Sequence, residues 1–73
     1  MLGLLIKENE QKEMEYLLKR ELEEILLDLG DDRIEQVVKH AMRKRYQTLF
    51  QMFRRVASEE ECMKYMPKQS YNQ

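Results

Sequence analysis

Between residues 4 and 66 the chain contains a single residue that strongly breaks helices, Gly30. The other glycine and the only proline, Gly3 and Pro67, lie outside this range. No segment alternates apolar and polar residues in the way that a half-buried strand does. The sequence therefore predicts an all-α protein whose main feature is an antiparallel helical hairpin that turns at Gly30.

The residues around Gly30 predict where the two long helices end and begin. Gly30 follows a helix predicted over 8–29, at the position where glycine commonly adopts a left-handed conformation. Asp32 and Glu35 match the spacing of a capping box, and both acids suit the positive end of a helix dipole. The second helix is therefore predicted over 32–57.

A short third helix is predicted over 59–66. Ser58 and Glu61 repeat the capping pattern at its start, and a proline follows its end. The remaining polar segment, 67–73, is predicted to fray. A chain of 73 residues forms one domain at most, so we expect 1–73 to be a single helical domain with a small core.

Apolar side chains recur at helical spacing in both long helices. In the first helix they form one stripe of Met14, Leu18, Leu22, Ile25 and Leu29. In the second helix they form a broader face of Ile34, Val38, Ala41, Met42, Tyr46, Leu49, Met52, Phe53 and Val56. The third helix is too short to cover this face, so two hairpins are predicted to pair with C2 symmetry into a four-helix bundle. The predicted protein is thus a homodimer.

The charges are segregated along the chain. Residues 1–32 carry −6 (four bases, ten acids), residues 33–57 carry +6 (seven bases, one acid) and residues 58–73 carry −1 (two bases, three acids). At 100° per residue, the cations lie away from the apolar face of the second helix. They form a candidate interaction face of Arg33, Lys39, Arg43, Lys44, Arg54 and Arg55. Phe50 is the one aromatic side chain expected among them.

Three interpretations of this basic face are open. The cations can complement the acidic first helix across the hairpin, where opposite charges favour the correct pairing. They can instead dock an acidic protein, or follow the phosphates of a nucleic acid. The net charge of −1 and the scarcity of aromatics among the cations argue against nucleic acid, which is kept as the alternative. Internal complementarity is the favoured interpretation.

Arg45 is the charged side chain expected inside the apolar face of the second helix. Because an unpaired guanidinium is costly to bury, we expect Arg45 to be paired or to reach the rim of the face. In an antiparallel hairpin Arg45 lies level with Leu18. Glu15 and Glu21 are therefore its candidate partners in a buried ion pair.

The sequence lacks the patterns that are typical of catalytic and metal sites. His40 and Cys62 are the only residues of their kinds, so one chain cannot supply a structural zinc site. The acids of the first helix lack the histidines of a di-iron carboxylate bundle, and no glycine-rich phosphate loop occurs. We therefore expect no enzymatic activity and no cofactor.

The cysteine count and the first residues bear on the location of the protein. A single cysteine excludes an internal disulfide and suits a reducing compartment. The apolar run at residues 1–6 is too short to span a membrane and no cleavage site follows it, so we expect a cytoplasmic protein without membrane association. The function expected from these features is that of a small adaptor or regulator that binds another protein.

Overall fold

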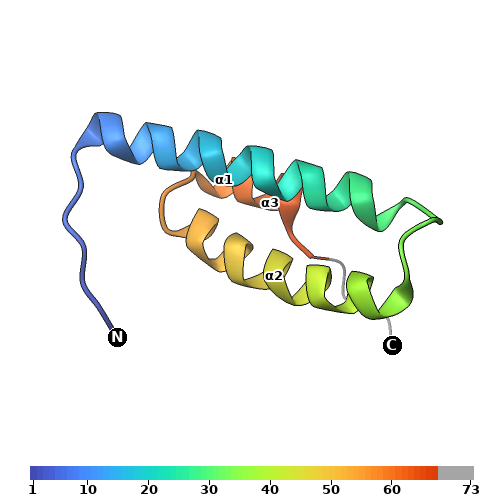
Figure 1. Ribbon diagram of the computed structural model, residues 1–73. Helices are drawn as coiled ribbons and strands as arrows, with labels where there is room; N and C mark the ends of the chain where they lie inside the picture. The colour runs from blue at the N-terminus through green and yellow to red at the C-terminus, as the bar shows by residue number, and fades with distance from the viewer. Residues whose placement is uncertain (68–73) are drawn as a thin grey trace.

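The computed structural model describes residues 1–67 and contains three helices in this range (Figure 1). Helix α1 spans Glu8–Leu29, α2 spans Gln36–Arg54 and α3 spans Glu59–Tyr65. Helices α1 and α2 run antiparallel and pack against each other, and α3 folds back onto α2. The predicted all-α hairpin with a short third helix is therefore confirmed. The predicted frayed tail lies, except for its first residue, outside the described residues.

Helix α1 has the bounds that the sequence predicts. The carboxylate of Glu10 accepts a hydrogen bond from the backbone N–H of Lys7 (2.8 Å), and Glu8 places a second acid in the first turn. Both acids satisfy the positive end of the helix. The apolar residues 1–6 precede α1 in extended form and are exposed. Among the described residues, no helix is both long enough and apolar enough to cross a membrane.

The turn between α1 and α2 differs from the prediction. Gly30 has a φ of −86°, so the expected left-handed glycine is wrong. Asp31 organises the turn, because its carboxylate accepts hydrogen bonds from the backbone N–H of Arg33 (2.9 Å) and from the Arg33 guanidinium. This turn delays α2 until Gln36, four residues later than predicted. The residue before α2 is Glu35, which makes no side-chain cap, so the predicted Asp32–Glu35 capping box is also wrong.

The start of α3 agrees with the sequence. The Ser58 hydroxyl accepts a hydrogen bond from the backbone N–H of Glu61 (3.2 Å), as the repeated capping pattern predicts. Helix α2 ends at Arg54 rather than at residue 57, and α3 ends at Tyr65, one residue earlier than predicted.

The core lies where α1, α2 and α3 meet. Its buried residues are Leu18, Leu22, Ile25, Tyr46, Phe50, Phe53, Val56 and Tyr65. The rings of Phe53 and Tyr65 pack edge to face, with centroids 5.5 Å apart. The Tyr46 hydroxyl donates a hydrogen bond to the backbone carbonyl of Tyr65 (2.5 Å). These contacts fix the end of α3 against the second half of α2.

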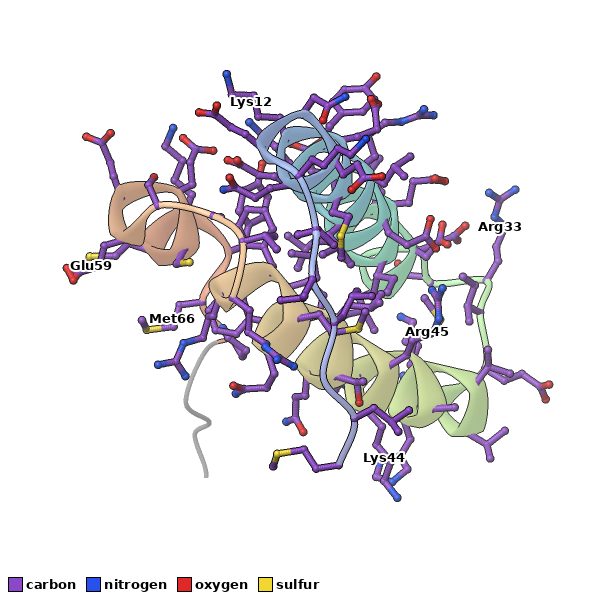
Figure 2. The ribbon with its side chains drawn as sticks, turned by 90° about the vertical axis from the view of Figure 1, so that its left-hand side faces the viewer. Lys12, Arg33, Lys44, Arg45, Glu59 and Met66 are labelled. Carbon is purple, nitrogen blue, oxygen red and sulfur yellow. The ribbon has the colours of Figure 1, made fainter. Side chains whose placement is uncertain are left out.

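Helix α3 covers only one flank of the α1–α2 pair, which we call the covered side. On this flank α1 presents Lys19 and Glu23 to α3. The opposite flank, the open side, is marked by a contact between Arg45 and Glu21. Figure 2 shows α3, with Glu59, on one side of the hairpin and Arg45 on the other.

The position of α3 shifts the buried face of α2 away from the predicted one. Phe50 is buried, although the sequence places it among the cations. Val38, Ala41 and Met52 are exposed on the open side, although the sequence places them in the core. Both errors have one cause: the helical period defines an apolar arc, but it does not say which edge of the arc a third helix covers.

Candidate interaction face

Two of the six cations predicted to form a surface do not belong to it. Arg33 lies in the turn and forms a salt bridge with Asp31, with 3.0 Å between Nη2 and Oδ2. This hydrogen-bonded pair lowers the pKa of Asp31 and raises the pKa of Arg33. Lys39 is buried, with 6% of its surface exposed. The predicted face is therefore wrong at these two positions.

Lys39 is buried, but its ammonium group is not cut off from water. Its side chain makes no hydrogen bond to the described residues, and no fully buried side-chain nitrogen or oxygen among them lacks a partner. The ammonium group therefore keeps contact with water while its aliphatic stem is packed, as is common for lysine. Its charge contributes to the lowered pKa of Asp31. Lys39 belongs to the base of the turn.

The four remaining cations are exposed on the side of α2 that points away from α1, which we call the outer basic face. Its members are Arg43, Lys44, Arg54 and Arg55. Figure 2 shows Lys44 pointing away from α1. None of the four forms a salt bridge with a described residue. Arg54 has one weak contact, from Nη1 to Oε1 of Gln51 at 3.4 Å. Because α2 contains no acid, this face has only positive charge.

The aromatic side chains of α2 do not join the outer basic face. Tyr46, Phe50 and Phe53 are all buried in the core. An exposed aromatic group lies instead on α1, where the Arg20 guanidinium is 5.8 Å from the centre of the Tyr16 ring. The outer basic face thus offers charge without a surface on which bases can stack.

Arg45 pairs with one of its two predicted partners. Its Nη1 donates a hydrogen bond to Oε2 of Glu21 at 2.8 Å, whereas Glu15 forms no hydrogen bond or salt bridge with it. The pair is not buried, because both side chains keep a large exposed fraction. The prediction of a buried ion pair is therefore wrong in its burial, and for a physical reason: the pair lies on the flank that α3 leaves uncovered.

The covered side has a polar network that the sequence does not reveal. Glu61 of α3 contacts Lys19 of α1 (3.1 Å) and Lys64 (2.8 Å), and these two lysines, Lys64 foremost, lower its pKa. The Tyr65 hydroxyl donates a hydrogen bond to Glu23 of α1 (2.6 Å). Burial, followed by this hydrogen bond, raises the pKa of Tyr65 to about 12. The only sequence signal is the four-residue spacing of Lys19 and Glu23, which puts them on one side of α1.

Direct charge complementarity between α1 and α2 is limited. Among residues 1–67, the pair of Arg45 and Glu21 is the one salt bridge that joins the two helices. The sequence favours internal pairing of the cations with α1. The four cations of the outer basic face do not form such pairs among the described residues.

The residues with reactive side chains are dispersed. His40 is exposed on α2 and Cys62 is half-buried on α3. Within the described part of the chain, no three His, Cys, Asp or Glu residues are grouped to hold a metal ion. Comparison with protein-family models, with curated proteins and with solved structures finds no significant match to this chain.

Proposed function

We propose that this protein is a non-catalytic interaction module, an adaptor or regulator, that works as a homodimer and docks an acidic surface of another protein on its outer basic face. The observation that carries this proposal is the set of exposed cations on α2 that form no salt bridge within residues 1–67. Exposed guanidinium and ammonium groups that form no internal salt bridge can bind carboxylates of a partner through charge-assisted hydrogen bonds.

The homodimer is supported by the apolar side chains on the open side. Leu17 of α1 is 56% exposed, Val38 of α2 is 46% exposed and Met52 of α2 is 42% exposed. A domain of this size has a small core, and pairing two such sides adds to the buried apolar surface.

An acidic protein suits the outer basic face better than a nucleic acid does. The chain carries a net charge of −1, and ten of its acids lie within residues 1–32. These acids repel a phosphate backbone at long range, whereas a short acidic segment of a protein needs only the local positive potential. The burial of Tyr46, Phe50 and Phe53 also removes the stacking surface that single strands use.

The test compares two labelled probes, a glutamate-rich helical peptide and a duplex DNA, by fluorescence anisotropy at physiological salt. We expect the peptide to bind more tightly than the duplex. Arg43→Glu combined with Arg54→Glu should weaken peptide binding about tenfold, since two charge pairs become repulsive. The matched control is Lys12→Glu with Arg20→Glu, which changes the net charge equally on the exposed surface of α1.

Each other outcome contradicts part of the proposal. Tighter binding of the duplex, lost in the Arg43/Arg54 variant, would favour the nucleic-acid alternative. Equal weakening by the α1 control would show that net charge acts, and not the outer basic face. No binding of either probe would overturn the docking role. Sedimentation equilibrium tests the dimer separately, because a mass that stays at 9.0 kDa at all concentrations would exclude it.

A further inference from the structure

The open side has two edges of opposite charge. On α1, spacings of three, four and seven residues place one stripe along this flank: Glu10, Leu17, Glu21, Glu24 and Asp28. On α2 the neighbouring stripe on this flank consists of Val38, Ala41, Arg45 and Met52. The salt bridge between Glu21 and Arg45 shows that the two stripes border the same flank. The edge formed by α1 therefore contains acids and no base, and the edge formed by α2 contains a base and no acid.

We infer that the open side binds the open side of a second copy of this chain, with the two-fold axis parallel to the helices. This inference rests on the proposed homodimer and specifies its geometry. Such an axis places α1 of each copy antiparallel on α2 of the other, so that an acidic edge meets a basic edge twice. A two-fold axis that crosses the helices would place α1 on α1 and α2 on α2. Like charges would then face each other, which is unfavourable.

The register of the hairpin predicts which charges meet. Within one chain Glu21 is level with Arg45, and Gln11 is level with Val56, whose carbonyl accepts a hydrogen bond from the Gln11 amide. A rotation about an axis parallel to the helices does not change these levels. Glu24 of the partner subunit then lies level with Lys44, and Glu13 of the partner subunit lies level with Arg55, each within about half a helical turn. Lys44 and Arg55 are the members of the outer basic face that border the open side, so Arg43 and Arg54 remain for the acidic protein.

Arg45 occupies the centre of this interface. Its guanidinium makes one hydrogen bond to a described residue, from Nη1 to Glu21. The guanidinium has five N–H donors, so most of them are free to bind a second carboxylate. Glu24 of the partner subunit can supply this second carboxylate, because it lies on the α1 stripe that packs against α2 in the proposed dimer. Leu17, Val38 and Met52 provide the apolar contacts on either side.

The size of this surface predicts a weak dimer. Helix α2 has 19 residues and is about 28 Å long, and a layer of two helices is about 20 Å wide, which gives roughly 1,100 Å² buried in total. This area is at the lower end of specific interfaces. We therefore expect a reversible dimer, whose geometry depends on its charges because the apolar area alone is modest.

Cross-linking tests the geometry directly. Two variants are made in a Cys62→Ser background, Glu24→Cys on α1 and Ala41→Cys on α2, both at exposed positions that are level in the hairpin. With a short bismaleimide, the equimolar mixture should give cross-linked dimers, and neither variant should do so alone. Cross-linking of Glu24→Cys with itself, or a dimeric mixture without cross-links, would overturn the inference.

Charge reversal provides a second test that is independent of the cysteines. Lys44→Glu with Arg55→Glu, and Glu13→Lys with Glu24→Lys, should each weaken the homodimer about tenfold or more, because rim attractions become repulsions. An equimolar mixture of the two variants should restore the dimer, because the α1 and α2 edges are again opposite in charge. Unchanged homodimerisation of either charge-reversed variant alone would contradict the two-fold axis parallel to the helices. A wild-type chain that stays monomeric would instead contradict the proposed dimer itself. Docking of an acidic protein on the outer basic face would still be decided by the anisotropy experiment.

Discussion

The covered and open sides of the hairpin are built from the same two helices, yet they hold α1 and α2 in different ways. The covered side has three buried aromatic rings of α2 (Tyr46, Phe50 and Phe53), a tyrosine of α3 that reaches α1, and a salt bridge between α1 and α3. The open side has a single salt bridge in water and four exposed apolar side chains, Leu17, Val38, Ala41 and Met52. Apolar composition alone therefore does not decide burial, because a seven-residue helix selects which flank of α2 enters the core.

The largest difference between the two sides should appear when neighbouring residues of α2 are truncated. Phe53 is fully buried against Tyr65, whereas Met52 is exposed on the open side. Phe53→Ala should lower the free energy of unfolding by about 3–5 kcal/mol, most of the stability of a domain of this size. Met52→Ala should lower it by less than about 0.5 kcal/mol in the monomer, as is usual for surface positions.

Urea unfolding of both variants at a concentration that keeps the chain monomeric makes this comparison. Similar losses at the two positions would mean that the two sides do not differ as the structure shows. The Met52 variant should in addition weaken the dimer, because Met52 lies on the proposed interface.

A second test uses the ionisation of Tyr65 on the covered side. Its pKa is raised from 10.0 to about 12, so folding favours the neutral phenol. This contribution to stability is complete below pH 10 and is lost as the pH rises from about 10 toward about 12. Tyr65→Phe should cost about 1 kcal/mol at neutral pH through the lost hydrogen bond to Glu23. It should also make the free energy of unfolding fall less steeply above pH 10.

The control for this test is Tyr16→Phe on the exposed face of α1. The Tyr16 variant should keep the alkaline slope of the wild type. The slope that remains in the Tyr65 variant is expected from Tyr46, whose pKa is also raised by burial. Identical slopes in all three proteins would contradict the assignment to Tyr65.

The smallest expected difference is between the two salt bridges. The side chains of Lys19 and Glu61 are 38% and 21% exposed, and those of Arg45 and Glu21 are 56% and 41% exposed. Because water screens the second pair more, double-mutant cycles in the monomer should give a larger coupling for the pair of Lys19 and Glu61 than for the pair of Arg45 and Glu21. A larger coupling on the open side would reverse the comparison.

An Arg43→Ala cycle with Glu21→Ala gives the baseline, since Arg43 lies on the outer basic face. The same cycles can be repeated at a protein concentration at which the dimer forms. Dimerisation should raise the coupling of Arg45 and leave that of Lys19 unchanged.

The sequence predicts the parts of the fold that depend on local signals. Ser58 caps α3 as its pattern indicates, and the stripe from Leu18 to Ile25 is buried. Two local signals predict the turn wrongly: Asp31, rather than Asp32, closes it, and Gly30 ends α1 without a positive φ. In a run of Asp-Asp both residues suit either role, so the spacing to Glu35 does not discriminate between them.

The remaining errors depend on tertiary contacts. Phe50 and Lys39 lie at one edge of the apolar arc of α2, and Val38 and Met52 lie at the other. Either edge satisfies the helical period, and only the docking of α3 through Tyr65 selects the first. Arg45 pairs with Glu21, one of the two partners that the register of the turn predicts, and not with Glu15. Whether Arg45 is buried or reaches the rim depends on which flank α3 covers, so the sequence leaves both alternatives open.

The coverage of one flank by α3 also bears on how many copies the proposed dimer contact could join. A hairpin without α3 would have two exposed apolar flanks. Further copies could bind at both flanks, which would allow open-ended association into a fibre. Helix α3 occupies one flank, with Tyr46 and Glu23 holding Tyr65 in place. If the chain dimerises as proposed, each copy has one open side, and association through that side would stop at two copies. Helix α3 would thus limit the size of the assembly, because it leaves no second flank to which a third copy could bind.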